Sequence, residues 1–108
     1  MDLRLIYITA GDMEEAQRIG HSLVSDRLAA CVNIVDNMRS MYWWEGRIQH
    51  DREVIIIAKT QASRVPSLIE RVTSLHRDEC PCVVSLPLKE GYRPFLQWIE
   101  SETQADST

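Results

Sequence analysis

The segment from residue 76 to residue 82 carries the densest group of metal-capable side chains in this sequence, namely His76, Asp78, Glu79, Cys80 and Cys82. Thiolates and imidazole favour copper or zinc, and a carboxylate completes a coordination shell. In an extended backbone Cys80 and Cys82 point to the same side, so their sulfurs can share one ion. The alternative is structural: Cys82 is a small core residue, His76 caps a helix end, and the two carboxylates lie in solvent. No second Cys-x-Cys pair and no His-x-x-x-His pair accompanies them, so both interpretations stay open.

The use of cysteine predicts a reducing environment. The chain has three cysteines, an odd number, and its first four residues do not open a secretory signal. We therefore expect free thiols in a cytoplasmic protein rather than a disulfide framework. Cys31 lies between two apolar residues and is expected to behave as a small hydrophobic side chain. A nucleophilic pair of Cys80 with His76, and a redox pair of Cys80 with Cys82, are further hypotheses.

Two adjacent tryptophans, Trp43 and Trp44, follow Tyr42 in a segment rich in strand-forming residues. Neighbouring residues of a strand face opposite sides, so one ring is expected to pack inward and the other against a neighbouring subunit. Tyr42, Trp44 and Glu45 are accordingly predicted at an oligomer interface. The alternative is that Trp43 and Trp44 form a stacking platform for a ligand in a cleft.

Lys59 ends a long apolar run, where its ammonium group needs a partner. An ion pair with Glu45, or a hydrogen bond from the ammonium group to a carbonyl oxygen, across a hairpin would supply one. The functional alternative is a small-anion pocket formed by Lys59, His76 and Tyr92. Lys59 and Tyr92 are therefore candidate ligand-binding residues.

Composition excludes several classes of function. The chain has 108 residues and a net charge of −4, which fits one domain and disfavours binding to nucleic acid. No stretch approaches the ~20 apolar residues of a membrane span. The sequence contains no G-x-S-x-G, no glycine-rich phosphate loop and no H-E-x-x-H, so we do not expect an enzyme.

The pattern of apolar residues predicts the elements that position these side chains. Strands are expected at 3–9, at 30–49 as one long extended segment, at 53–60 and at 82–86. Residues 49–52 are expected to turn the long segment back, with Gly46 and the Asp36-Asn37 pair as possible breaks. Helices are expected at 12–26, from Ser63 (as N-cap, with Pro66 in the first turn) to His76, and after Gly91. The polar tail 101–108 is expected to fray.

This order, β-α-β-β-α-β-α, is typical of an α+β ferredoxin-like sandwich with an extra C-terminal helix and a long hairpin. At about 3.3 Å per residue the segment 30–49 would reach roughly 65 Å, whereas a compact domain of this length has a radius of gyration of about 13 Å. Residues 53–58 are apolar on both faces of their strand. Both features predict an obligate oligomer.

Several blocks resemble the CutA family of divalent-cation tolerance proteins. They are Leu28–Ile34 (Leu-Ala-Ala-Cys-Val-Asn-Ile), Tyr42–Gly46 (Tyr-Trp-Trp-Glu-Gly), Glu53 to Thr60, Leu75-His76, Glu79, Pro81, Leu86-Pro87, Gly91-Tyr92 and Trp98-Ile99. The resemblance covers about residues 3–100. The chain is thus identified as a single CutA-like domain over 1–108.

The resemblance implies a ferredoxin-like homotrimer, similar in architecture to nitrogen-regulatory signalling proteins, that is linked to tolerance of copper and other divalent metals without a known enzymatic reaction. It also makes Cys31 a candidate metal ligand beside His76, Glu79, Cys80 and Cys82. The alternative is a trimeric scaffold that binds a small molecule or protein in its inter-subunit clefts. Where the family commonly reads Leu-His-Pro-Tyr-Glu-x-Pro, this chain carries Arg77 and Asp78 in place of Pro and Tyr.

Overall fold

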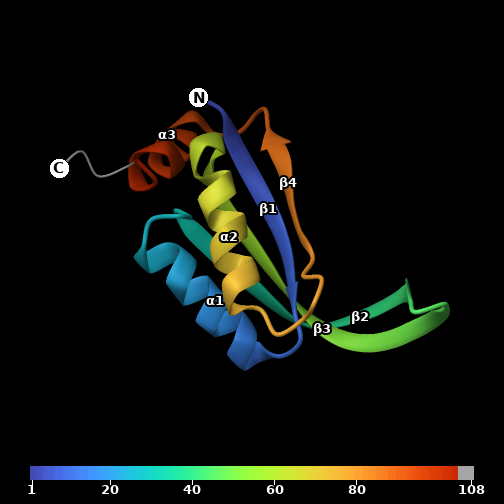
Figure 1. Ribbon diagram of the computed structural model, residues 1–108. Helices are drawn as coiled ribbons and strands as arrows, with labels where there is room; N and C mark the ends of the chain where they lie inside the picture. Colours follow the sequence, from blue (N-terminus) through green and yellow to red (C-terminus); the bar gives the residue numbers. More distant parts are fainter. Residues whose placement is uncertain (105–108) are drawn as a thin grey trace.

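Four antiparallel strands form one sheet in the order β2-β3-β1-β4 in the computed structural model, which describes residues 1–104 (Figure 1). The elements in chain order are β1 (Leu3–Ala10), α1 (Met13–Ser25), β2 (Cys31–Trp44), β3 (Arg47–Gln61), a 3₁₀ helix η1 (Ala62–Arg64), α2 (Val65–Leu75), β4 (Val83–Leu88) and α3 (Arg93–Glu102). Helices α1 and α2 lie side by side on one face of the sheet (Figure 1). The predicted α+β ferredoxin-like class, with its extra helix and long hairpin, is confirmed.

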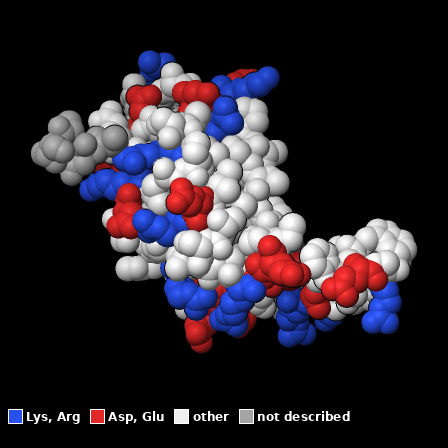
Figure 2. Space-filling view, in the orientation of Figure 1, with Lys and Arg blue, Asp and Glu red and all other residues white. Residues whose placement is uncertain are grey.

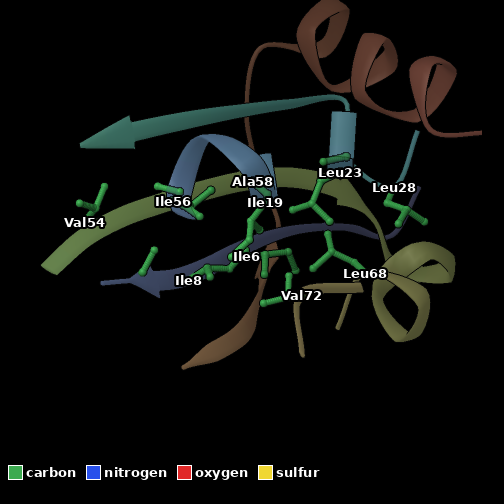
Figure 3. Close-up of a cluster of buried hydrophobic side chains, with 13 residues drawn as sticks. Ile6, Ile8, Ile19, Leu23, Leu28, Val54, Ile56, Ala58, Leu68 and Val72 are labelled. Atoms are coloured by element: carbon green, nitrogen blue, oxygen red, sulfur yellow. The ribbon is translucent and has the colours of Figure 1, made fainter. Parts of the chain in front are cut away.

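The core lies between the sheet and helices α1 and α2. Alternate residues of β1 and β3 point to this side, because successive side chains of a strand face opposite ways. Its buried side chains, most of them labelled in Figure 3, include Ile6, Ile8, Val54, Ile56 and Ala58 from the strands and Ile19, Leu23, Leu68 and Val72 from the helices. Each large one contributes about 1.5–3 kcal/mol to folding. This layer fixes the helices, and through them the loops at their ends.

The β2–β3 hairpin differs from the prediction in its turn. Residues 49–52, expected to reverse the chain, instead pair with 39–42 inside the ladder. The chain reverses at Glu45 and Gly46, whose φ values are 52° and 76°. Two successive positive φ values define the tight turn whose twist suits a hairpin, and glycine adopts such values without steric cost. The end of the hairpin, residues 38–53, projects from the body and is called the arm below (Figure 1).

A bulge sets the direction of the arm. The β2–β3 register shifts between Val35 and Met38, and Asn37 has a φ of 69°. The predicted break at Asp36-Asn37 is therefore confirmed. Because the hairpin bends here, the molecule has a longest dimension of only 46 Å.

Two further expectations about the helices are wrong. Ser63 is not the N-cap of α2; it lies inside η1, and the cap position is held by Arg64 without a side-chain hydrogen bond. Residues 101–103 do not fray, since α3 extends to Glu102 and Thr103 is fully buried. The Thr103 hydroxyl donates to the Ile99 carbonyl at 2.8 Å. The rest of the predicted tail, 105–108, lies outside the described residues.

The second face of the sheet bears apolar side chains that α1 and α2 do not cover. Val84 and Leu86 of β4 are 51% and 48% exposed, and Val35 of β2 is exposed as well. Figure 2 shows that the surface on the β4 side of the body is largely free of charged residues. Ile55 and Ile57 of β3 are only partly buried, so the expectation of an apolar strand on both faces is confirmed.

Candidate functional site

A cleft of about 810 Å³ separates the arm from the loop between α2 and β4, residues 76–82. Its walls are formed by 38–42, Trp44 and Glu53 of the arm, by 77–80 and Cys82 of the α2–β4 loop, and by Tyr7 and Thr9 of β1. Acidic and basic side chains lie close together where the arm leaves the body (Figure 2). The cleft thus joins two segments that are about forty residues apart in the sequence.

The α2–β4 loop is held by a buried carboxylate at the start of α1. Glu15 is 2% exposed, and its two oxygens accept the backbone N–H groups of Gly11 and Arg77, each at 2.8 Å. The Arg77 guanidinium also contacts Asp12 at 3.2 Å. Asp12 is the N-cap of α1 and accepts the N–H of Glu15, so one helix start anchors the loop that lines the cleft.

Two acidic groups in this anchor are stabilised in their charged forms. Burial alone would raise the pKa of Glu15. The hydrogen bonds from the N–H groups of Gly11 and Arg77, together with the nearby His76 and Arg77 side chains, have the larger opposite effect, so the pKa is lowered from its ordinary value of 4.5. The hydrogen bond from the Glu15 N–H, with smaller contributions from Arg77, lowers the pKa of Asp12. Both carboxylates therefore stay ionised at neutral pH.

His76 is also part of this anchor. Its side chain is 1% exposed, and its Nε2 lies 2.7 Å from the Thr9 carbonyl oxygen. The Asp78 N–H donates to its Nδ1 at 3.0 Å, which leaves the proton of the neutral ring on Nε2. Both ring nitrogens are engaged, so the ring has no free lone pair for a metal ion in this conformation.

The predicted four-ligand cluster is not assembled. Within residues 1–104, no three His, Cys, Asp or Glu side chains converge as a metal site would require. Glu79, Cys80 and Cys82 nevertheless line the same cleft, and both cysteines are exposed free thiols. His76 holds the C-cap position of α2, as the structural interpretation of the sequence proposed. That interpretation is wrong for Cys82, which is exposed and not part of the core.

Cys31 and Lys59 lie elsewhere on the sheet. They are direct partners in the β2–β3 ladder, and the Lys59 Nζ lies 3.7 Å from the Cys31 Sγ and 2.6 Å from the Asn33 Oδ1. The predicted Lys59–Glu45 ion pair is therefore wrong, because Glu45 is in the turn at the far end of the hairpin. Lys59 is also paired with Leu5 of β1, whereas His76 contacts Thr9, so the predicted anion pocket of Lys59 and His76 is not formed.

Neither tryptophan of the arm packs inward as predicted, since Trp43 and Trp44 are 71% and 41% exposed. Trp44 lines the cleft, whereas Trp43 does not and is 71% exposed. Tyr42 also lines the cleft, and its hydroxyl group donates a hydrogen bond to the Asp51 carboxylate. This hydrogen bond, together with burial and the negative charge of Asp51, raises the pKa of Tyr42 to about 12. Tyr92, a candidate ligand-binding residue, is not part of the cleft and is exposed.

Sequence reasoning missed several residues that build the site. Met38, Met41 and Tyr7 line the cleft, and Glu15 anchors its loop. Of these residues, only Glu15 could be recognised from the local sequence, because it follows Asp12 by three residues, the spacing of a helix capping pair. The methionines line the same cleft as Cys80 because of the bend of the arm, which no short sequence pattern encodes.

A four-stranded antiparallel sheet with an uncovered apolar face, a projecting arm and a cleft between arm and body defines a small α+β domain of the ferredoxin-like class. The chain belongs to the CutA1 divalent ion tolerance protein family, whose model matches residues 4–102. The recognition made from the sequence blocks is thereby confirmed.

Individual relatives agree with this assignment. The chain is 40% identical over 100 residues to the rice protein CutA 1, chloroplastic, covering 93% of this chain and 56% of that protein. It is 41% identical to the divalent-cation tolerance protein CutA of Thermus thermophilus, covering 92% and 96% of the two chains. The crystal structure of CutA1 from Oryza sativa superposes with a TM-score of 0.94 at 38% identity, covering 98% and 97% of the chains. The chain thus spans about half of the rice protein but nearly all of the Thermus protein. None of its described helices has the length and apolarity needed to cross a membrane.

Proposed function

We propose that this chain is a non-enzymatic, cytoplasmic divalent-cation tolerance protein that forms a homotrimer and binds copper or another divalent metal ion. Family membership supports the tolerance role. The observation that carries metal binding is that Glu79, Cys80 and Cys82 all line the cleft. Thiolates and carboxylates together provide ligands for copper and zinc. Three free thiols favour a reducing compartment, although the rice relative is named chloroplastic.

The uncovered face of the sheet supports the homotrimer. Val84 and Leu86 are about half exposed on β4, and the arm carries exposed Trp43 and Ile48. Large apolar side chains grouped on a surface mark an interface, since their burial gains about 25 cal/mol per Å². We place Tyr42, Trp44 and Glu45 of the arm at the same interface, against a neighbouring subunit.

Sedimentation at micromolar concentration tests the assembly. The parent is expected to sediment at three times its 12.5 kDa subunit mass. Leu86→Lys, which places a charge on the apolar face, is expected to release monomers. Gln97→Lys adds the same charge to an exposed position of α3 and is expected to leave the trimer intact. A folded parent at the mass of one subunit would refute the assembly.

Growth in copper tests the tolerance role. A bacterial strain that lacks its own CutA is transformed with the parent or with an empty vector, and growth is measured across copper concentrations. The parent is expected to restore growth at copper levels that inhibit the empty-vector strain. Equal inhibition of both strains, with the parent expressed and folded, would refute the role.

A scaffold function is the second candidate, and the size of the cleft favours it. About 810 Å³ is far more than one ion requires and falls in the range of small-molecule pockets, and Tyr7, Tyr42 and Trp44 provide aromatic walls. A thermal-shift screen separates the two candidates, because a ligand stabilises according to its concentration relative to Kd. A metabolite that raises Tm more than any metal ion at equal ligand concentration would favour the scaffold.

A further inference from the structure

Lys59 is a charged residue among apolar ones on the uncovered face of the sheet. Ile56 and Ala58 of β3 belong to the core. Successive side chains of a strand face opposite ways, so Ile55, Ile57 and Lys59 point away from α1 and α2. The strand pairing adds further apolar side chains to this face, namely Leu5, Tyr7, Val35, Val84 and Leu86.

The ammonium group of Lys59 has more donors than acceptors. It carries three N–H groups. The Asn33 Oδ1 lies 2.6 Å from the Lys59 Nζ, and the Cys31 Sγ, a weak acceptor, lies 3.7 Å from it. Within residues 1–104 no carbonyl or carboxylate oxygen accepts a further hydrogen bond from this group. At least one N–H is therefore left for an acceptor outside the subunit.

Covering this face changes what the ammonium group can contact. In a single copy the face is open, and solvent can complete the hydrogen bonds of the ammonium group. A partner that covers the face with apolar atoms alone excludes this solvent, and a buried charged donor without an acceptor is strongly destabilising. The surface that covers Lys59 must therefore bring an oxygen acceptor.

A second copy of this chain fits as the partner. The arm carries uncovered apolar side chains of its own, since Trp43 and Ile48 are 71% and 54% exposed. The arm of one copy can cover the sheet face of the next, and head-to-tail contacts of this kind close into a ring when the rotation between copies permits. The chain has 16 Asp and Glu residues against 12 Lys and Arg residues, so a second copy also brings carboxylates in excess.

We propose that, in the homotrimer, the Lys59 ammonium group of one subunit binds an oxygen acceptor of the neighbouring subunit, either a carboxylate or a backbone carbonyl, while Asn33 and Cys31 hold the group in position. The inference rests on the proposed homotrimer and adds a polar contact that its apolar interface has to satisfy. Lys59 thereby selects the arrangement of subunits in which an acceptor faces it, because any other arrangement buries an unpaired charge.

Substitution of Lys59 by methionine tests this contact through the sign of its effect on assembly. Lys59→Met keeps an unbranched side chain and leaves the neighbour's acceptor buried without its donor. The trimer is expected to dissociate at a protein concentration at least about tenfold higher than the parent, as measured by sedimentation in a dilution series. If the neighbour supplied no acceptor, methionine would suit the apolar face better than lysine, and the trimer would hold as tightly or more tightly.

The chain provides a matched control. Lys59 and Lys89 are its two lysines, and Lys89 is exposed in the segment before α3. Lys89→Met removes the same charge and is expected to leave the dissociation of the trimer unchanged within about twofold. Circular dichroism confirms that each variant is folded before assembly is compared.

Acylation of amines provides a second measurement on the unsubstituted protein. The parent trimer is treated with an acylating reagent, and the modified lysines are identified by peptide mapping. Lys89 is expected to react at least about tenfold faster than Lys59, because an amine that is buried and hydrogen-bonded reacts only when the contact opens. In Leu86→Lys, which is expected to release monomers, the difference between Lys59 and Lys89 is expected to shrink.

The class of the acceptor is tested by Lys59→Gln, which keeps N–H donors but has no charge. A backbone carbonyl is expected to accept from the amide, so assembly recovers part of the loss seen in Lys59→Met. A carboxylate is expected to gain less, because its contact with lysine is charge-assisted.

Two results would overturn the proposal: a Lys59→Met trimer at least as tight as the parent, or acylation of Lys59 as fast as that of Lys89 in the parent trimer. The outcomes are separable from the test of the assembly itself. A folded parent at the mass of one subunit refutes the homotrimer, whereas a parent trimer that Lys59→Met does not weaken refutes this contact alone.

Discussion

Removal of the Glu15 carboxylate is expected to destabilise the protein far more than removal of its neighbour on the same helix. Glu15 is 2% exposed and accepts the N–H groups of Gly11 and Arg77. Glu15→Ala leaves both donors buried without an acceptor, and each such loss costs about 1–3 kcal/mol. We expect a decrease of about 3 kcal/mol in the free energy of unfolding. Glu15→Gln keeps one acceptor oxygen and is expected to cost about 2 kcal/mol.

Urea denaturation measures this difference. With a slope of about 2 kcal/mol per molar urea, a loss of 3 kcal/mol lowers the midpoint by about 1.5 M. Parent and variants are compared at equal protein concentration, because the stability of an oligomer depends on it. Glu14→Gln is the matched control, since the Glu14 side chain is 84% exposed and lies 3.9 Å from Arg18. It is expected to change stability by less than about 0.5 kcal/mol.

The dependence on pH gives a second measurement of the same contact. The pKa of Glu15 is lowered in the folded protein, so its carboxylate stabilises the fold above the ordinary value of 4.5. This stabilisation is lost as the pH falls below 4.5 and through the lowered pKa. The difference between the parent and Glu15→Gln is therefore expected to shrink with acidification. A difference below about 0.5 kcal/mol at neutral pH, or one that grows in acid, would refute the proposed anchor.

Three further substitutions test other parts of the fold and the cleft. Asp51→Asn removes the carboxylate that raises the pKa of Tyr42 to about 12, so an ultraviolet titration is expected to show this pKa falling toward 10; an unchanged titration would contradict the contact. Gly46→Ala is expected to cost about 1 kcal/mol in urea denaturation because φ is 76°, and Gly46→Asn less, because asparagine tolerates positive φ. Arg77→Pro removes the N–H that donates to Glu15 and is expected to lower the free energy of unfolding by about 2 kcal/mol. Arg77→Ala keeps this N–H and is expected to lower it by about 0.5 kcal/mol. Equal losses in the two variants would assign the effect to the side chain rather than to the N–H.

The order and type of the elements could be predicted because hydrophobic periodicity is local. The alternation along β1 and the helical spacing in α1 each show within about ten residues, and the structure confirms both. The hairpin turn was predicted at residues 49–52 because they form a cluster of four polar residues, which is typical of a turn. The actual turn, Glu45-Gly46, has only two residues and so gives a weaker signal of polarity. Polarity alone does not distinguish an exposed strand of an arm from a turn, whereas the positive φ that glycine permits does.

The candidate site was predicted only in part, because it depends on contacts between distant segments. Glu79, Cys80 and Cys82 were recognised from their ligand chemistry, and they do line one cleft. The opposite wall comes from the arm, whose direction depends on the bulge near Asn37. His76 looked like a ligand by type, but its burial against Thr9 assigns it to the anchor. Side-chain chemistry thus identified candidates, and the fold decided which of them are available.

The anchor explains how this loop keeps its conformation without the proline that the family commonly carries after the histidine. Arg77 stands at that position, and unlike proline it has an N–H, which the buried Glu15 accepts. Its guanidinium then reaches Asp12, so a hydrogen bond and an ion pair to α1 take over the restraint that a fixed φ would provide. Such a restraint depends on the ionisation of Glu15, whereas a proline ring does not. The wall of the cleft that carries Cys80 and Cys82 is therefore held by a titratable group, and this restraint weakens when acid neutralises Glu15.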